Sequence, residues 1–188
     1  MIYDITKELF TTEVYPGDPV PKIERVSSLD QDVCQLSEIT IGSHSGTHLD
    51  APAHFCVRGK DVSEIPLEKC AGKCRIVSHN GTVRKEQIDQ WTMDGIDKIL
   101  IHGDVVIHAD SAEYMAEKKI NCLGVEMGTV AYGNDQIPVH KILLGAEIVI
   151  IEGLTLEQVP DGIYFLSAAP LKMQGSDGSP VRAFVYTL

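Results

Sequence analysis

The pattern of hydrophobic and polar positions predicts strands and helices that alternate in the middle of the chain. Four apolar segments have the length of strands: CRIVS at 74–78, KILIH at 98–102, INCLGV at 120–125 and EIVIIEGL at 147–154. Three segments between them have helical character: 83–91, 111–119, which Ser111 is placed to cap, and 139–146. Alternation of this kind is typical of an α/β protein.

Both ends of the chain add further strand patterns. The segments are IYDIT at 2–6, VCQLSEITIG at 33–42, GIYFLSAAP at 162–170 and VRAFVYTL at 181–188. YPGDP at 15–19 is turn chemistry, and GSDGSP at 175–180 is a glycine-rich loop. No internal repeat or linker interrupts the pattern, so we expect residues 1–188 to form a single domain. The expected fold is an α/β domain built on a mixed sheet or a partly closed barrel.

The composition narrows the class of protein. With 188 residues, 44% of them hydrophobic, the chain is long enough for one well-packed core. The formal net charge is −11 and no run of lysine or arginine occurs, which argues against binding to nucleic acid or to an anionic membrane surface. No segment approaches the roughly 20 apolar residues that span a bilayer, and the acidic opening is unlike a secretory signal.

The five cysteines predict a reducing compartment. An odd number of cysteines in a chain of this size fits free thiols in the cytoplasm better than a disulfide framework. Cys70 and Cys74 form a CxxxC pair that could supply half of a zinc site. Because no second cysteine pair completes such a site, we expect both to be structural thiols.

The most informative stretch is HSGTHLDAPAHF at 44–55, which holds three histidines and an aspartate. A helix is disfavoured here, because Gly46 costs roughly 1 kcal/mol in a helix interior and Pro52 stops a helix. In an extended chain His44 and His48 would lie about 13 Å apart, too far for two ligands of one ion. We therefore expect the chain to bend at Ser45 and Gly46.

The same stretch has the residue types of a metal site. His48 and Asp50 face the same way in a strand, and the bend can bring His44 to them. Two imidazoles and a carboxylate suit Zn²⁺, Mn²⁺ or Fe²⁺, and three protein ligands leave an open position, as in catalytic zinc sites. The alternative is a polar surface loop whose histidines bond to backbone carbonyls. The spacing His-x3-His-x-Asp-x3-His favours the metal site over that loop.

HSGTHLDAPAHF closely resembles the HxGTHxDxPxHF signature of the metal-dependent cyclase family, which includes bacterial kynurenine formamidases and isatin hydrolases. Other landmarks agree in order: YPGDP, then His140 followed by Glu152, then EGL and APLKMQGSDGSPVRA. The resemblance therefore runs nearly end to end. It implies a swivelling β/β/α-type fold, a centre with one or two metal ions per subunit, and a homodimer or homotetramer.

For individual residues, the resemblance implies metal ligands and a catalytic histidine. The implied ligands are His44, His48 and Asp50 for one ion, and His140 and Glu152, with Asp50 shared, for a second. His54 is implied as the acid/base residue. Zinc is the first expectation for the metal, with manganese or iron as alternatives. The sequence itself supports Glu152, because a carboxylate at the end of the apolar run IVII requires a cation.

Two segments depart from the pattern of kynurenine formamidases and leave the exact substrate open. Where those enzymes usually carry arginine-threonine-glycine after the strand at 98–102, this chain reads LIHGDVVIHAD. The family's Gly-x-Asp-x-x-Ser turn is written GVEMGT at 124–129. His102 and His108 are candidate pocket groups, although we expect ordinary surface or strand roles for them, and a packing role for Cys56. Tyr15 is our candidate for an apolar wall against an aromatic substrate.

The function that follows is hydrolysis of a small-molecule amide, lactam or ester. A divalent ion with an open position can activate water and polarise a carbonyl, and His54 can take up and return the proton. A lactone- or isatin-type ring-opening hydrolase is an alternative within the family. The alternatives from other functional classes are a small-molecule binding or sensor protein of the same fold that kept the metal without turnover, and a protein whose metal is purely structural.

Overall fold

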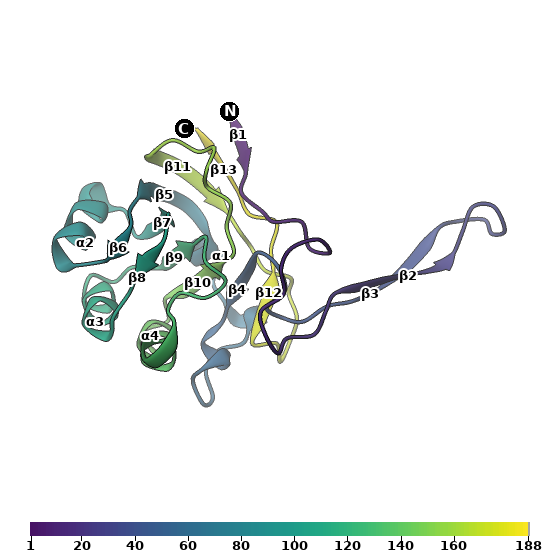
Figure 1. The fold of residues 1–188 in the computed structure, drawn as a ribbon, viewed down its shortest axis with the longest axis horizontal. Helices are drawn as coiled ribbons and strands as arrows, with labels where there is room; N and C mark the ends of the chain where they lie inside the picture. Colours follow the sequence, from purple (N-terminus) through teal and green to yellow (C-terminus); the bar gives the residue numbers. More distant parts are fainter. Residues whose placement is uncertain (188) are drawn as a thin grey trace.

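The computed structural model describes residues 1–187 of the chain, and its centre is a nine-stranded mixed sheet (Figure 1). In sheet order the strands are β1 (Ile2–Asp4), β13 (Phe184–Thr187), β11 (Gly162–Ser167), β5 (Ala71–Ser78), β7 (Lys98–His102), β9 (Cys122–Val125), β10 (Val149–Glu152), β4 (His48–Asp50) and β12 (Gly178–Pro180). The central strands β5, β7, β9 and β10 are parallel, and the outer pairs are antiparallel. The sheet curls strongly into a half-barrel, which confirms the predicted mixed sheet or partly closed barrel.

Helices connect the parallel strands and cover one face of the sheet. In chain order α2 (Lys85–Trp91) lies between β5 and β7, α3 (Ala109–Glu117) between β7 and β9, and α4 (Gln136–Gly145) between β9 and β10. The three helices lie together on one side of the sheet (Figure 1). The short elements are α1 (Leu67–Cys70), β6 (Gly81–Thr82), β8 (Val105–Val106), and the 3-10 turns η1 (Pro52–His54), η2 (Val62–Glu64), η3 (Met93–Gly95) and η4 (Gly133–Asp135). None of the helices formed by residues 1–187 is long and apolar enough to cross a membrane.

The hydrophobic core is divided between the two faces of the sheet, because side chains alternate along each strand. On β7, Ile99 and Ile101 pack under the helices with Met115 of α3. Leu100 points to the other face and joins a cluster within the curl that includes Leu49 of β4. All five side chains are fully buried. Burial of each such side chain contributes about 1.5–3 kcal/mol, so the core holds β4 firmly against the rest of the sheet.

The helices and strands predicted in the middle of the chain are present with shifted bounds. α3 begins at Ala109 with His108 at its N-cap position, so the prediction that Ser111 caps this helix is wrong. The Ser111 hydroxyl donates instead to the carbonyl oxygen of Val83. The loop predicted at 175–180 contains strand β12, which pairs with β4. Leu188, the last residue of the predicted strand at 181–188, lies outside the described residues.

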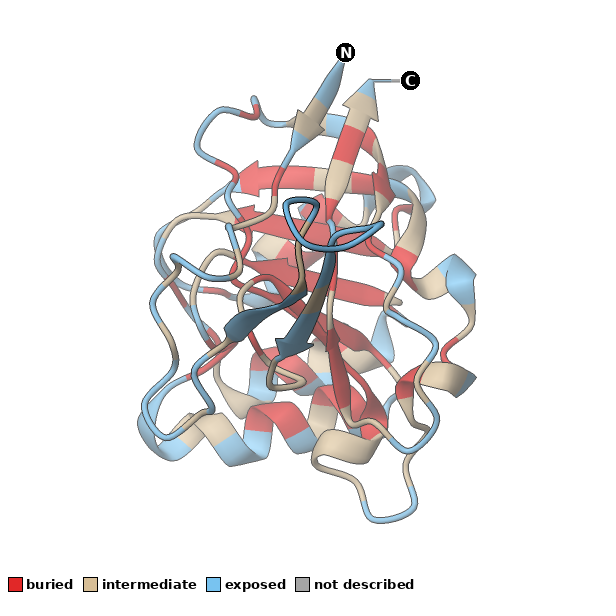
Figure 2. Cartoon of the chain, turned by 90° about the vertical axis from the view of Figure 1, so that its right-hand side faces the viewer, coloured by how far each residue is buried: buried red, intermediate tan, exposed pale blue. Residues whose placement is uncertain are grey.

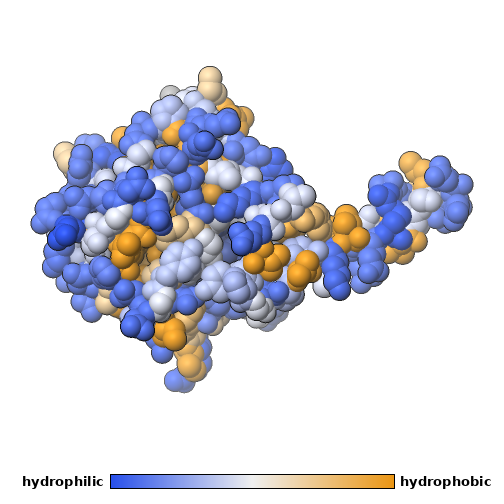
Figure 3. Space-filling model, in the orientation of Figure 1, coloured by the Kyte–Doolittle hydropathy of each residue, from blue (hydrophilic) through white to orange (hydrophobic). Residues whose placement is uncertain are grey.

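A two-stranded hairpin extends away from the main sheet. It is formed by β2 (Lys22–Ser27) and β3 (Leu36–Thr40), which pair with each other in a separate sheet. We call residues 20–40 the hairpin arm; it projects to the right in Figure 1 and toward the viewer in Figure 2. Every residue of the arm is exposed or half-buried, and hydrophobic residues are spread along it (Figure 3). They include the cross-strand pair Ile23 and Ile39, which are 53% and 54% exposed.

Candidate metal centre

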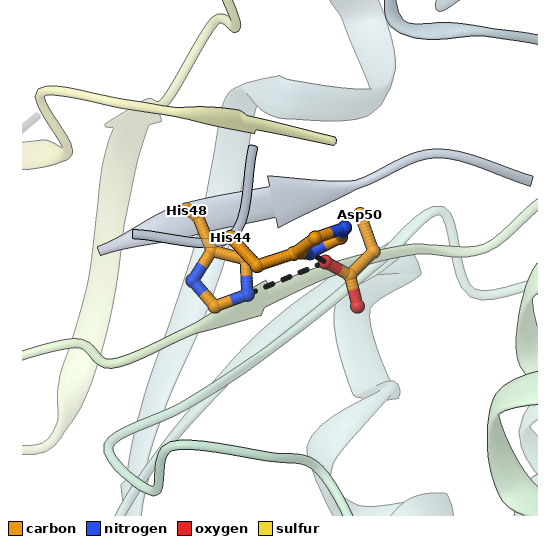
Figure 4. A group of neighbouring side chains, drawn as sticks. All are labelled: His44, His48 and Asp50. Atoms are coloured by element: carbon orange, nitrogen blue, oxygen red, sulfur yellow. Dashed lines mark hydrogen bonds and ion pairs between the residues drawn. The ribbon is translucent and has the colours of Figure 1, made fainter. Parts of the chain in front are cut away.

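The histidine-rich stretch folds back on itself because the chain bends at Gly46. Gly46 has a φ of 64°, a left-handed conformation that glycine adopts without strain, so the predicted bend is confirmed. The ring centroids of His44 and His48 lie 5.1 Å apart, instead of the about 13 Å of an extended chain. Both rings lie beside Asp50 (Figure 4). Asp50 Oδ1 is 2.8 Å from His44 Nδ1 and 3.4 Å from His48 Nε2.

The sheet itself adds a second carboxylate to this group. Strand β4 carries His48 and Asp50 on one face and Leu49, a core residue, on the other. Its register places His48 directly opposite Glu152 of β10. Opposite residues of an antiparallel pair point to the same face, so Glu152 joins the cluster. Its Oε2 atom lies 3.4 Å from His48 Nε2.

Helix α4 contributes His140. The residue is 2% exposed, and its Nε2 atom lies 3.3 Å from Glu152 Oε1 and 3.9 Å from Asp50 Oδ2. The Phe55 ring stacks on the imidazole with centroids 4.5 Å apart, and Leu143 on the same helix is part of the core. The structure therefore brings together all five residues that the sequence analysis named as ligands.

The backbone fixes one proton, on Nδ1, in two of these histidines. His48 Nδ1 lies 3.0 Å from the carbonyl oxygen of Gly46, and His140 Nδ1 lies 2.6 Å from that of Gln136. A carbonyl oxygen only accepts hydrogen bonds, so Nδ1 is the donor in both rings. Nε2 then faces the carboxylate of Glu152 with either a proton or a lone pair. A backbone carbonyl on one ring nitrogen is the usual arrangement for a histidine that binds metal through the other.

Asp50 gives the clearest sign that a cation belongs in this cluster. Its side chain is only 1% exposed, and Oδ2 has no hydrogen-bond partner among residues 1–187. An unpaired buried polar group costs about 1–3 kcal/mol, and a charged one more. Ligand atoms of His44, His48 and Asp50 lie within 4.8 Å of one another, and so do those of Asp50, His140 and Glu152. This set of imidazole nitrogens and carboxylate oxygens fits a divalent metal ion.

The carboxylates also favour the protonated form of the histidines. Burial lowers the pKa of His44, but the hydrogen bonds and charges of Asp50 and Asp177 outweigh burial and raise it to about 9. Burial also lowers the pKa of His48 and of His140. The hydrogen bond from each ring to Glu152 outweighs burial, so that the pKa of both histidines is raised. A divalent cation therefore competes with protons for the same nitrogen atoms.

His54 lies beside the cluster and is held by a residue that the sequence analysis did not single out. Its Nδ1 atom lies 3.0 Å from Asp177 Oδ2, and the same oxygen lies 3.0 Å from His44 Nε2. Ser43 Oγ donates to the other oxygen of Asp177 at 2.9 Å. Burial opposes ionisation of Asp177, but these contacts hold the pKa of its carboxyl well below its usual range. The signal that could have found Asp177 is its place in GSDGSP, within the segment that matches the family.

Gly178, the next residue, allows the His44 ring to lie against strand β12. A Cβ atom at this position would lie 2.6 Å from His44 Cε1 and 3.0 Å from both ring nitrogens. Such distances are far shorter than ordinary contacts, so any larger residue displaces the ring. Asp177 and Gly178 thus define the position of His44 from the far end of the chain.

Two neighbouring cavities open onto the cluster. The smaller one, about 210 Å³, is lined by residues that include His44, His48, His54, His140 and Glu152. The larger one, about 250 Å³, shares His44, His48 and Tyr15 with it. Tyr15 therefore contributes to the walls of both cavities. A molecule in these cavities can reach both the cluster and His54.

The other candidates from the sequence are not among the described residues that line these cavities. His102 Nδ1 is 2.6 Å from Glu126, and His108 Nδ1 is 2.9 Å from Asp135. Glu126, which belongs to the altered GVEMGT turn, also accepts hydrogen bonds from two backbone N–H groups. Within residues 1–187, the lining of both cavities excludes His102, His108 and Cys56. His102 and His108 instead contact acidic side chains, and Cys56 packs against the core cluster under the helices.

Fold and site together define an α/β protein with a buried histidine–carboxylate cluster at the base of two cavities, the arrangement of metal-dependent enzymes. The family model for the cyclases matches residues 3–132, and the chain belongs to the cyclase family. Kynurenine formamidase from Maricaulis maris is 32% identical to it, with 93% of this chain and 92% of that protein covered.

Solved structures share the fold. A predicted metal-dependent hydrolase from Bacillus stearothermophilus gives a TM-score of 0.83 at 31% identity, covering 98% of this chain and 97% of that chain. Isatin hydrolase A from Labrenzia aggregata, bound to benzyl benzoate, gives a TM-score of 0.83 at 23% identity, covering 98% and 93%. The family and the fold implied by the histidine motif are thereby confirmed.

Proposed function

We propose that the protein is a metal-dependent hydrolase that cleaves the carbon–nitrogen bond of a small aryl formamide, as the name of its kynurenine formamidase relatives describes. The proposed reaction converts N-formylkynurenine and water to kynurenine and formate. The observation that carries it is the buried Asp50 carboxylate, whose Oδ2 atom lacks a hydrogen-bond partner among residues 1–187 and lies in a cluster that opens onto cavities. A metal cluster open to a cavity suits catalysis better than a closed structural site does.

The metal ligands in this proposal are His44, His48 and Asp50 for one ion, and His140, Glu152 and the shared Asp50 for a second. Zinc suits this mixture of nitrogen and oxygen donors, and manganese or iron are the alternatives. When bound, a divalent ion supplies water activation near neutral pH and polarises the substrate carbonyl. The protein's part is to hold the ligands, to position the substrate and to move protons.

His54 is the proposed acid/base residue. The contact from its Nδ1 atom to Asp177 orients the ring and leaves Nε2 for exchange with the substrate. Burial lowers the pKa of His54, so the imidazole is neutral and able to accept a proton at neutral pH. His54 takes a proton from water as the carbon–oxygen bond forms, and returns it to the leaving nitrogen as the carbon–nitrogen bond breaks.

Tyr15 is the proposed wall against the aromatic ring of the substrate. It lines both cavities, and its hydroxyl oxygen accepts a hydrogen bond from Gln136 Nε2 at 3.2 Å. This bond ties the early turn of the chain to helix α4, which carries His140. Stacking of an aryl ring on Tyr15 is expected to contribute about 0.5–1.5 kcal/mol beyond the area buried.

The hairpin arm supports the proposal of a homodimer or homotetramer. An isolated two-stranded hairpin is marginally stable in water, and the arm exposes apolar side chains on its strands. A second copy of the chain that covers Ile23 and Ile39 would remove this apolar surface from water. We further propose that residues 1–188 form a single domain that works in the cytoplasm, where its five free cysteines stay reduced.

The test combines metal analysis with a panel of N-formylkynurenine, isatin and a simple lactone. His54→Ala is expected to retain the metal and to lose turnover by about 10²- to 10⁴-fold. His108→Ala removes a histidine outside both cavities and serves as the control, with activity like that of the unmodified protein. Metal-loaded protein that turns over no member of the panel would instead identify a binding or sensor protein.

A further inference from the structure

Lys7 places a positive charge in the larger of the two cavities. Among residues 1–187, it is the one lysine or arginine that lines either cavity, in a chain with 16 basic and 27 acidic residues. His44 and His48 line the same cavity of about 250 Å³. A single small molecule can therefore contact both the Lys7 ammonium group and the metal-binding cluster.

Two hydrogen bonds fix the backbone of Lys7 against the strands of the site. Its N–H donates to Thr47 Oγ1 at 2.9 Å, and that hydroxyl donates to the carbonyl oxygen of Gly153 at 2.6 Å. Thr47 immediately precedes His48, and Gly153 immediately follows Glu152. The base of the Lys7 side chain is thus held in a constant position relative to two proposed ligands.

The ammonium group of Lys7 has unused capacity for an anionic partner. Its Nζ atom donates to the carbonyl oxygen of Glu126 at 3.2 Å, and no residue of 1–187 forms an ion pair with it. An ammonium group carries three donors. By contrast, each of the other three lysines that are not exposed pairs with an acidic side chain; they are Lys60, Lys69 and Lys98. A half-buried cation without a carboxylate partner, in a cavity beside a reactive cluster, is suited to bind an anionic group of a ligand.

We propose that Lys7 is a specificity-determining residue that binds a carboxylate of the substrate, an inference that rests on the proposed formamidase function. Lys7, His44 and His48 line the same cavity, so one substrate molecule can contact Lys7 and the histidine cluster together. Its formamide end meets the cluster, and its carboxylate meets Lys7. The role is one of selection among aryl formamides, separate from the bond-breaking chemistry.

Two acidic residues in the same cavity refine the class of substrate. Glu13 and Asp18 line it together with Lys7, and they repel a ligand that carries carboxylates alone. A free amino-acid group carries an ammonium as well as a carboxylate, and these acids attract the ammonium. The cavity therefore suits the zwitterionic amino-acid group of N-formylkynurenine better than a neutral or a dianionic group.

The test uses pairs of molecules that differ only in this amino-acid group. N-formylkynurenine and 2-formamidoacetophenone share the aryl formamide, and only the first is zwitterionic. In Lys7→Gln, the ratio of kcat/KM for N-formylkynurenine to that for the neutral formamide is expected to fall about tenfold to a hundredfold, mainly through KM. Lys7→Arg keeps the charge and retains most of the preference. Lys73→Gln, at an exposed position on β5, removes one charge elsewhere and is the matched control.

Ligand binding separates this inference from the proposed function, because it needs no turnover. Metal-loaded protein is titrated calorimetrically with kynurenine and with 2-aminoacetophenone, which lacks the amino-acid group. A Kd for kynurenine raised about tenfold or more in Lys7→Gln, with a smaller change for 2-aminoacetophenone, supports the inference even where no formamide is hydrolysed. Equal losses for both ligands, no loss for either, or an unmodified protein that does not prefer kynurenine would overturn it.

Discussion

Replacement of Gly178 by alanine tests the metal centre without replacing any of the proposed ligand residues. Gly178 lies on β12 directly opposite Asp50 of β4, and the His44 ring packs against it. The φ of Gly178 is outside the left-handed region, so alanine can adopt the same backbone. The added methyl group is therefore the whole perturbation, and it acts on the His44 ring.

The size of the effect follows from the contact distances. The new Cβ would lie 2.6 Å from His44 Cε1, about 1 Å closer than the best separation of two carbon atoms. The ring or β12 has to move by a comparable amount, whereas bonds from a ligand to a metal tolerate only about 0.2 Å. We expect the metal affinity to fall about tenfold to a hundredfold. A misplacement of about 1 Å near reacting groups lowers turnover by about a hundredfold.

The assay is a competition titration of metal between the protein and a chromophoric chelator, with circular dichroism to show that the fold is intact. Gly145→Ala is the matched control, because a Cβ there would meet only Cys56 Sγ, at an ordinary 3.9 Å. Gly145 ends helix α4, where alanine is tolerated well. Unchanged metal affinity in folded Gly178→Ala protein would show that His44 is not a ligand, and the assignment of the first ion would have to be abandoned.

Three further predictions test other parts of the molecule. Asp177→Asn weakens the group that orients His54, so kcat should fall about tenfold to a hundredfold in steady-state assays; an unchanged kcat would remove Asp177 from the mechanism. Ile39→Glu places a charge on the hairpin arm and should give a monomer in light scattering, whereas an unchanged mass would exclude the arm as the subunit interface. Burial raises the pKa of the Cys74 thiol to about 12, so at mildly alkaline pH this thiol stays protonated and inert. Ellman's reagent should label exposed Cys34 in the native protein and all five cysteines only after unfolding, and rapid native labelling of Cys74 would contradict this reasoning.

The part of the site that could be predicted from the sequence is the part that is local in the chain. His44, His48 and Asp50 lie within seven positions. At that spacing His44 and His48 can bind one ion only if the chain bends between them, and Ser45 and Gly46 are the residues able to form the bend. Glu152 was also accessible, because a carboxylate that ends an apolar strand has to be compensated. Asp177 was not, since its role depends on a contact with His44 across 133 positions of sequence.

The same distinction holds for the fold. The central strands β5, β7, β9 and β10 are apolar on both faces, because they are covered by helices on one side and by the curl of the sheet on the other. Such apolar segments are easily recognised as strands in the sequence. Strands β4 and β12 are three residues long each, and β12 contains glycine and proline, so no alternation is visible in it. Strand β2, KIERVS, is almost entirely exposed. Its sequence therefore lacks the alternation of apolar and polar residues by which a strand that packs against a core is recognised.

The register of β4 against β10 has a consequence for how this protein can change over evolution. It sets two buried carboxylates, Asp50 and Glu152, on adjacent strands with oxygens that approach within 4.8 Å. A descendant that lost only its histidines would keep two mutually repelling charges in its interior, and such a chain folds poorly. Relatives that have lost metal binding should therefore carry neutral residues at both positions. A relative that retains both acids is expected to bind a cation still.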